Sequence, residues 1–127
     1  PGSAGLDLHM LQPSGCPRFF RPGERCLVRT GLQVIIPPGY EGQVRPRSGL
    51  ASRGVTVLNS PGTIDADFRG ELHVLLVNLG EVSVELEPDE RIAQLVVAPV
   101  AMLEVLEVEP QPEDTERIGG FGSTGRS

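Results

Sequence analysis

Lysine and tryptophan are both absent from this sequence of 127 residues, and aromatic side chains make up only 4% of it. All 11 basic residues are arginines, and they are outnumbered by 17 Asp and Glu, so the formal net charge is −6. An acidic chain gains no general electrostatic attraction to nucleic acid, so nucleic acid is not an expected partner. A phosphate-bearing ligand would instead be held by a local arrangement of arginine and backbone N–H groups.

Long apolar segments are also lacking. No apolar run approaches the roughly 18 residues needed to span a bilayer, and no basic segment followed by an apolar one opens the sequence. We therefore expect a soluble, cytoplasmic protein with no membrane partner. The two cysteines, Cys16 and Cys26, lack metal-ligand spacing. Their pattern favours two free thiols in a reducing compartment over a single disulfide.

Glycine and proline are abundant, with 16 and 12 residues, which favours short strands and tight turns over a helical bundle. Residues 81–87 alternate, so Val82, Val84 and Leu86 are predicted to share one buried face of a strand. Two more continuously apolar runs predict strands covered on both faces: residues 72–77 and 92–97. About nine short strands with regular turns predict an all-β barrel or sandwich.

One helical turn is predicted over residues 48–53, with Ser48 as its N-cap. Residues 109–116 have the polar, Pro-rich composition of a linker. Four glycines then surround Phe121, in a segment that cannot bury enough surface to order itself. We therefore expect a β domain over residues 1–109 and a flexible glycine-rich C-terminal arm over residues 110–127. The arm is either a floppy terminus or a flap that orders over a phosphate-bearing ligand.

Two segments carry candidate chemistry on their residue types alone. Residues 45–49 place arginine and a hydroxyl before the predicted helix, where backbone N–H groups attract anions; the alternative is a surface turn with solvated arginines. Residues 58–70 are predicted to form a hairpin whose backbone edge could face a flat ligand. Asp65 and Asp67 would share one side of a strand, and for Asp67 we favour the capping of a local turn. Arg91 is expected to pair structurally with its neighbour Asp89.

Five segments, in order along the chain, resemble the five motifs of the trimeric dUTPase family, the dUTP nucleotidohydrolases. Each motif alone is weakly specific, whereas five in register are very specific. The segments are Ala-Gly-Leu-Asp-Leu at 4–8, Pro-Arg-Ser-Gly-Leu-Ala at 46–51, residues 58–70, Arg-Ile-Ala-Gln-Leu at 91–95, and residues 117–125. The resemblance implies a β-jelly-roll subunit and a homotrimer. It also implies three active sites at subunit interfaces, each of which borrows the arm of another chain.

The resemblance implies hydrolysis of dUTP to dUMP and diphosphate, which limits uracil in DNA and supplies dUMP for dTMP synthesis. Water would attack the α-phosphate while Mg²⁺, Arg47 and Arg117 neutralise the charge of the triphosphate. Asp65 matches the carboxylate that orients and deprotonates this water, for which it must be ionised and within about 3 Å of it. Asp7 matches the acid that holds Mg²⁺ through water.

The resemblance also assigns residues to each part of the nucleotide. Backbone groups fixed in place would read uracil, because cytosine presents the wrong donor and acceptor pattern and the thymine methyl would collide. The matched residues are Asn59, Thr63, Ile64 and Asp65, with the strand near His73, for uracil; Phe68 for the deoxyribose; Arg47, Ser48, Gly49 and Gln94 for the phosphates; and Arg117, Phe121, Gly122 and Ser123 for the closing arm.

The sequence departs from the family pattern in three places. Phe68 stands where the family usually has Tyr, and the segment from Arg117 to Phe121 is one residue shorter than the common Arg-Gly-x-Gly-Gly-Phe. The first motif lies almost at the start of the sequence, where the family usually has an earlier strand. We therefore expect the sequence to be truncated or processed.

Three alternatives to hydrolysis fit the sequence less well. The dCTP deaminases have related motifs, but their catalytic Glu falls at Leu75 in this sequence. The zinc deaminases are excluded because neither His-x-Glu nor Pro-Cys-x-x-Cys occurs. A non-catalytic trimer that senses nucleotides or binds proteins would lack the activating acid or the phosphate arginine, and both Asp65 and Arg47 are present. Hydrolysis of dUTP is therefore favoured.

Overall fold

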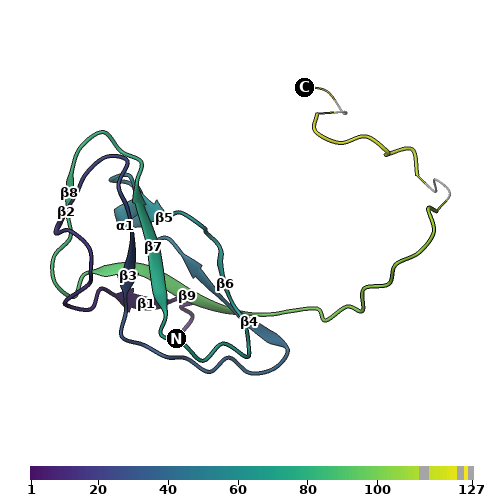
Figure 1. Ribbon diagram of the computed structural model, residues 1–127, viewed down its shortest axis with the longest axis horizontal. Coiled ribbons are helices and arrows are strands. Elements are labelled where there is room, and N and C mark those ends of the chain that lie inside the picture. The colour runs from purple at the N-terminus through teal and green to yellow at the C-terminus, as the bar shows by residue number, and fades with distance from the viewer. Residues whose placement is uncertain (112–114, 123–124, 126–127) are drawn as a thin grey trace.

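The computed structural model describes residues 1–111, 115–122 and 125 (Figure 1). Within these residues the chain forms nine strands and one short helix, which confirms the predicted all-β class. The elements, in chain order, are β1 (Leu6–His9), β2 (Phe19–Phe20), β3 (Arg25–Arg29), β4 (Tyr40–Arg45), α1 (Ser48–Ala51), β5 (Val55–Val57), β6 (Gly62–Ile64), β7 (His73–Asn78), β8 (Val84–Glu85) and β9 (Arg91–Pro99).

The strands pair in three antiparallel sheets. The largest has four strands in the order β1-β9-β4-β6, the second has three in the order β3-β7-β5, and β2 pairs with β8. The strands β7 and β9 lie over the two apolar runs predicted as strands, and each is the central partner of its neighbours. The core lies between the two larger sheets, because both contribute side chains to one buried cluster.

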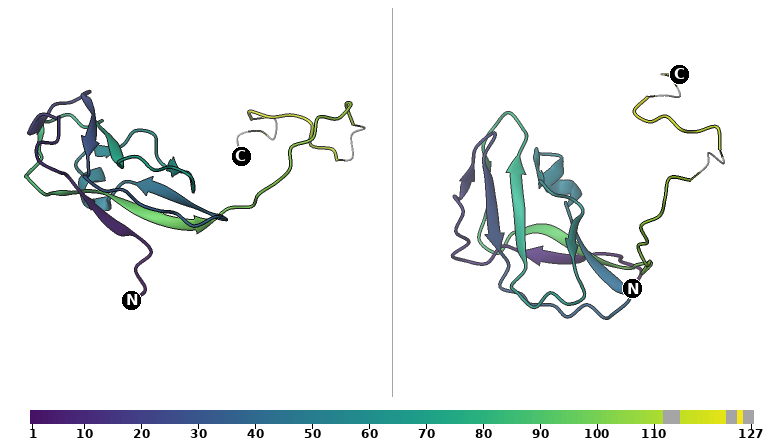
Figure 2. Two further views of the ribbon diagram at one scale, coloured as in Figure 1. Left: turned by 60° about the horizontal axis from the view of Figure 1, so that its bottom comes forward. Right: turned by 45° about the vertical axis from the view of Figure 1, so that its right-hand side comes forward.

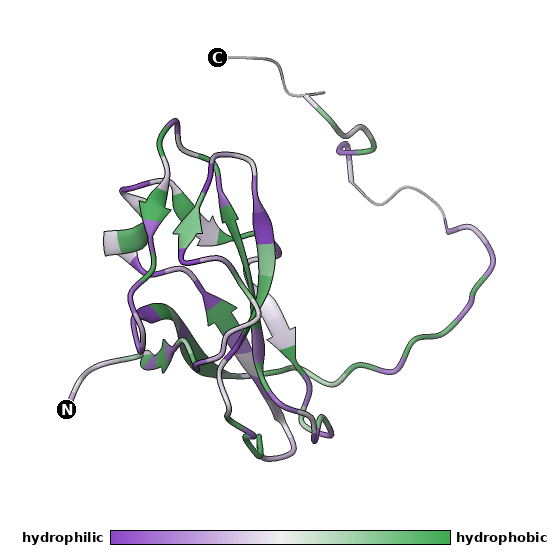
Figure 3. Ribbon diagram, turned by 60° about the vertical axis from the view of Figure 1, so that its left-hand side comes forward, coloured by the Kyte–Doolittle hydropathy of each residue, from purple (hydrophilic) through white to green (hydrophobic). Residues whose placement is uncertain are grey.

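Aliphatic side chains dominate this core, as the scarcity of aromatics predicts. Figure 3 shows hydrophobic segments on strands throughout the β body. Phe20, from β2, contributes a fully buried ring. The buried members of the cluster are Leu8, Met10, Phe20, Val28, Val44, Leu50, Val55, Val57, Leu72, Val74, Leu76, Val84, Leu86, Ile92, Ala93 and Leu95.

The strand predicted over residues 81–87 is shorter than its alternation suggested. Val84 and Leu86 are buried as predicted, but Val82 is 68% exposed and lies outside β8. The reason is Asn78, whose fully buried amide Nδ2 donates a 3.0 Å hydrogen bond to the Val82 carbonyl. Its Oδ1 accepts another, 2.9 Å long, from a backbone N–H two residues further on. These bonds hold the chain before β8 in a loop.

The hairpin predicted over residues 58–70 is wrong. The strand β5 pairs with β7, whereas β6 pairs with β4, so the segment between them crosses from one sheet to the other. Asp65 and Asp67 lie in the turn after β6 rather than on a strand. The predicted free backbone edge is nevertheless present, because β6 is the outer strand of its sheet.

The helical turn is confirmed over Ser48–Ala51, but its predicted cap is wrong. The N-cap position is occupied by Arg47, which has an extended backbone and makes no side-chain capping bond. Ser48 is therefore the first helical residue rather than the cap. The buried side chain of Leu50 anchors the turn to the core.

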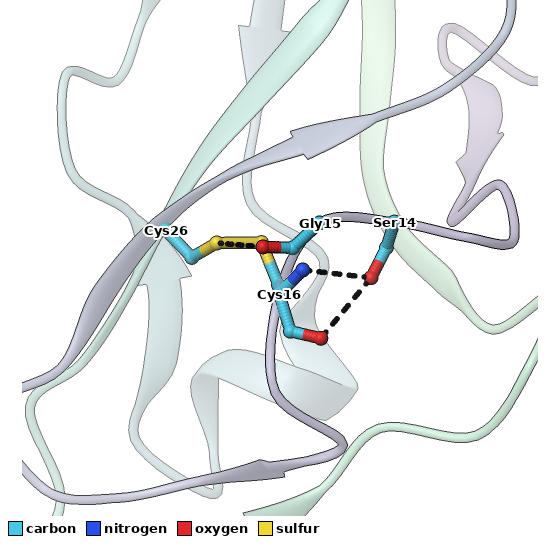
Figure 4. Close-up of a disulfide and its surroundings, with 4 residues drawn as sticks. All are labelled: Ser14, Gly15, Cys16 and Cys26. Carbon is cyan, nitrogen blue, oxygen red and sulfur yellow. Dashed lines mark hydrogen bonds between the residues drawn. A yellow bond between two sulfur atoms is a disulfide. The ribbon is translucent and has the colours of Figure 1, made fainter.

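The expectation of two free thiols is also wrong, because Cys16 and Cys26 form a disulfide with their Cα atoms 5.9 Å apart (Figure 4). Cys26 lies on β3, so the bond ties the loop between β1 and β2 to the three-stranded sheet. Ser14 braces the loop, since its Oγ accepts a 3.1 Å hydrogen bond from the Cys16 N–H. Disulfides are uncommon in reducing compartments, and the cytoplasmic location stays a prediction.

In the part of the chain that the structure describes, regular structure ends at Pro99. The following residues lead away from the β body in each view of Figures 1 and 2. The segment 102–108 is exposed yet rich in large apolar side chains, which are between 65% and 92% exposed: Met102, Leu103, Val105, Leu106 and Val108. The domain boundary at residue 109 stays a prediction. Among the described residues, no helix has the length and apolar character that a bilayer crossing requires.

Candidate functional site

Five of the predicted site residues gather where β1, β9 and α1 meet: Asp7, Arg47, Ser48, Gly49 and Gln94, which we call the anion cluster. Antiparallel pairing places Gln94 between Asp7 on one side and Arg45 on the other. Arg47 follows the end of β4, and its Nε lies 3.1 Å from Asp7 Oδ1. Gln94 Nε2 donates a 3.0 Å hydrogen bond to the Pro46 carbonyl, which holds the segment between β4 and α1.

The anion cluster lines a hollow of about 280 Å³ together with Ser3 and Gly5. A Cβ atom at Gly5 would overlap the Gln94 side-chain amide, so a larger residue there would force that amide to shift. The hollow combines a guanidinium, a hydroxyl and the first N–H groups of α1, which have no partner within the helix. These groups bind phosphate oxygens in many proteins.

Arg91 lies beside the anion cluster, although the sequence indicated only a structural pairing with Asp89. Its Nη1 lies 3.6 Å from Asp7 Oδ2, and no pairing with Asp89 occurs among the described residues. Asp89 instead occupies a tight turn with a φ of 59° before β9 begins. Because the pairing of β1 with β9 crosses more than 80 positions, no local pattern could have indicated it. Each oxygen of the Asp7 carboxylate thus faces a guanidinium.

A second group, which we call the β6 cluster, surrounds the end of β6. It lines a hollow of about 250 Å³ and comprises Thr63, Ile64, Asp65, Phe68, Glu71, Leu72 and His73. The turn after β6 is closed by a 3.1 Å hydrogen bond from the Phe68 N–H to the Asp65 carbonyl. The structure therefore brings together most of the residues matched to uracil and deoxyribose.

The Asp65 side chain is exposed at the rim of this hollow. Among the described residues, its carboxylate takes part in no hydrogen bond and no ion pair. Asp65 also borders a larger and more apolar hollow of about 640 Å³, which Tyr40 and Met102 line as well. Asp67 caps no backbone N–H in the described part of the chain, so the structure does not support the capping role expected for it.

Glu71 and its partner Arg29 were missed by the sequence reasoning. Arg29 Nε and Nη2 donate to the two Glu71 carboxylate oxygens, each over 3.1 Å, and the Gly31 N–H donates over 3.3 Å. The hydrogen bonds from Arg29 are the main reason that the pKa of Glu71 lies below its usual range, and Glu71 in turn raises the pKa of Arg29. His73 Nδ1 lies 3.1 Å from the Glu71 carbonyl oxygen.

Other predicted residues lie apart from both hollows. Asn59 is in the turn before β6, and among the described residues it does not line the β6 hollow. Arg117, Phe121 and Gly122 lie on the C-terminal segment, which leads away from the β body in Figure 1. The Arg117 N–H donates a 3.2 Å bond to Thr115 Oγ1, and the Phe121 side chain is fully exposed. Ser123 lies outside the described residues.

The anion cluster and the β6 cluster are well separated on one chain. Ile64 pairs with Gly42 of β4, so Asp65, the next residue, lies level with Glu41. Asp7 lies level with Arg45 of the same strand. The two aspartates are therefore four residues apart along the strands and three strands apart across the sheet. At about 3.3 Å per residue and about 4.8 Å per strand, the two aspartates are about 20 Å apart. The two hollows share no lining residue in the described part of the chain.

An all-β body with an arginine-lined hollow and an exposed, unengaged carboxylate fits the class of enzymes that act on phosphorylated substrates. Residues 1–125 match the sequence profile of the family described as dUTPase. The chain belongs to the dUTPase family and is accordingly an enzyme, a dUTP diphosphatase.

Named relatives and solved structures agree with this assignment. The deoxyuridine 5'-triphosphate nucleotidohydrolases of Rhizobium leguminosarum bv. trifolii and Rhizobium meliloti are each 53% identical over 98% of this chain, which covers 80% and 78% of theirs. A dUTPase mutant from Staphylococcus bacteriophage 80alpha, solved with dUpNHpp, is 28% identical with a TM-score of 0.82. That alignment covers 98% of this chain and 88% of the phage chain.

Proposed function

We propose that this enzyme converts dUTP to dUMP and diphosphate through a water that Asp65 activates for attack on the α-phosphate. The observation that carries this role is the unengaged Asp65 carboxylate at the rim of the β6 hollow. A general base must reach its water within about 3 Å. A carboxylate held by a neighbouring arginine would be a weaker base, because the cation stabilises its ionised form.

The β6 cluster fits a uracil nucleoside. The outer backbone edge of Thr63 and Ile64 offers peptide N–H and C=O groups held in place by pairing with β4. Such groups distinguish uracil from cytosine, because cytosine has an acceptor at N3 and a donor at its exocyclic amine, where uracil has a donor and an acceptor. The Phe68 ring, which lines the same hollow, offers a flat face to the deoxyribose. The dUpNHpp complex of the phage relative supports a nucleotide of this class.

The anion cluster fits the triphosphate together with Mg²⁺. The described residues contain no group of three His, Cys, Asp or Glu that could hold a metal by themselves. Mg²⁺ usually keeps several waters and binds through one or two carboxylates plus substrate phosphates, so the single carboxylate of Asp7 fits an ion held through water. When bound, the ion would neutralise charge on the phosphate oxygens. Arg47, Ser48, Gly49 and Gln94 would bind and orient the phosphates.

The separation of the two clusters supports a shared site in a homotrimer. A water beside Asp65 lies about 20 Å from the anion cluster of its own chain, too far to attack a phosphate held there. The β6 cluster of one chain would therefore meet the anion cluster of a second copy, and an arm would close over both. The exposed apolar segment 102–108 supports association, because burying it against another chain removes this surface from water.

Steady-state hydrolysis of dUTP, dCTP, dTTP and UTP by the wild type and by Asp65→Asn tests the proposal. We expect dUTP to be the strongly preferred substrate and the variant to be nearly inactive while still binding dUpNHpp. Wild-type turnover by Asp65→Asn would show that another group activates the water. Equal inactivity of both proteins, with nucleotide bound, would favour the non-catalytic alternative.

A further inference from the structure

The Phe68 ring lies against a residue that has no side chain. A Cβ atom at Gly70 would lie 2.7 Å from Phe68 Cζ and 3.0 Å from Cε1, closer than carbon atoms pack. Phe68 lines the β6 hollow and Gly70 does not. The ring therefore occupies the space that any larger residue at position 70 would fill.

Arg69 holds the backbone that carries this ring. Its Nη1 donates to the carbonyl oxygens of Ala66 and Phe68, over 2.9 and 3.0 Å. Gln33, from the segment after β3, donates in turn to the Arg69 carbonyl. With the Phe68 N–H also bonded to Asp65, the turn is braced at several points. A ring pushed by a new neighbour would have to move by side-chain rotation, because the backbone is held.

The conformation of Gly70 makes this position a clean test. Its φ lies outside the left-handed region, so an alanine fits the backbone without strain. The three atoms nearest to such a methyl group all belong to the Phe68 ring. Because Phe68 is 39% exposed, its ring has room to rotate away from the methyl group.

We infer that Gly70 is a positioning residue that sets the fit of the deoxyribose by leaving room for the Phe68 ring at the β6 hollow. The inference rests on the proposed function, in which that ring packs against the sugar. A methyl group at position 70 would displace the ring from the place in which it meets the sugar. Binding of the nucleoside part would weaken, while the contacts of the phosphates and of Asp65 would remain.

The test compares Gly70→Ala with the wild type in dUTP hydrolysis. We expect KM to rise by about 10-fold with kcat nearly unchanged, since small displacements of a packed contact have effects of this size. The inhibition constant of diphosphate, which has no sugar, should stay at the wild-type value. An unchanged KM for dUTP would overturn the inference, as would an equal loss of affinity for diphosphate.

The matched control is Gly70→Ala in a Phe68→Leu background, where no ring is displaced. We expect the second substitution to change KM there by less than about 2-fold, because the effect is transmitted by the ring. If Gly70→Ala alone does not fold, the double variant should fold, and its failure to do so would also overturn the inference. Asp65→Asn tests the proposed function separately, because it leaves Gly70 and the Phe68 ring unchanged. The two claims can therefore fail independently.

Discussion

The anion cluster and the β6 cluster differ in how far their charged groups are already engaged. Asp7 faces two guanidinium groups at 3.1 and 3.6 Å, and Gln94 is bonded to the neighbouring backbone. Asp65, in contrast, has no partner among the described residues. Groups that bind a polyanion gain from being held in place before it arrives, whereas a base must keep its oxygens free for water. The difference is expected if the anion cluster binds the phosphates and the β6 cluster provides the catalytic base.

Asp65→Asn, which removes the proposed base, should have the largest effect on activity. An amide cannot accept the proton of the attacking water, so we expect kcat to fall by about 10³ with KM close to the wild-type value. Steady-state kinetics with dUTP and Mg²⁺ measures both constants. Asp67→Asn is the matched control, because it changes the same charge two residues away and should stay within about 3-fold of the wild type. Equal losses in the two variants would contradict the assignment of the base.

Arg47→Ala tests the engaged side of the comparison. It removes a charged phosphate contact and the nearer partner of Asp7, so we expect kcat/KM for dUTP to fall between about 10-fold and 100-fold. Arg53→Ala serves as the control, because Arg53 is exposed after α1 and lines the described hollows of neither cluster. Comparable activity of the two alanine variants would show that the anion cluster does not hold the phosphates.

Arg117→Ala measures what the C-terminal arm contributes to activity beyond the two clusters. We expect turnover of dUTP to fall by about 10-fold, the loss of one charge-assisted phosphate contact. Hydrogen exchange should also show residues 115–122 more protected with dUpNHpp than without it. Unchanged turnover and equal exchange in both states would contradict a closing role for the arm.

The smallest expected effect concerns Glu71, the engaged carboxylate of the β6 cluster. The pKa of Glu71 is lowered in the folded chain, first by the hydrogen bonds from Arg29. The ionised carboxylate therefore stabilises the folded state at pH values above the pKa that Glu71 has in the unfolded state. That contribution is lost as the pH falls below about 4.3, the ordinary glutamate value. The midpoint temperature of thermal unfolding should therefore fall less between pH 7 and pH 3 for Glu71→Gln than for the wild type. Parallel curves would contradict the account.

The contrast between the clusters also marks what the sequence could predict. The motifs indicated Asp65, Arg47 and Gln94 because short segments carry them and regular pairing brings them into place. Arg29 and Arg91 were not expected as partners of Glu71 and Asp7, since each pair depends on strands that meet only in the fold. Hydrogen bonds from side chains to the backbone were equally beyond local pattern. Asn78, for example, holds the residues up to Val82 in a loop, so that β8 begins only at Val84.

The local sequence pattern also could not predict which sheet each strand joins. The turn around Pro61 and Gly62 has the composition of a hairpin, yet the flanking strands belong to different sheets. The pairing of Cys16 with Cys26 likewise depends on where β3 passes the preceding loop. Hydrophobic periodicity determines which residues are buried, whereas the choice of partner strand depends on the packing of the whole β body.

Subunit mixing tests the central claim, that one active site is assembled from clusters on two chains. Asp65→Asn is expected to be nearly inactive alone and Arg47→Ala to keep at most about a tenth of wild-type activity. The two proteins would be unfolded and refolded together in equal amounts. If the sites are shared, about a quarter of them would combine an intact β6 cluster with an intact anion cluster, and about a quarter of wild-type activity should return. If the mixture is no more active than the separate variants while forming mixed oligomers, each chain carries a complete site of its own and the account is wrong.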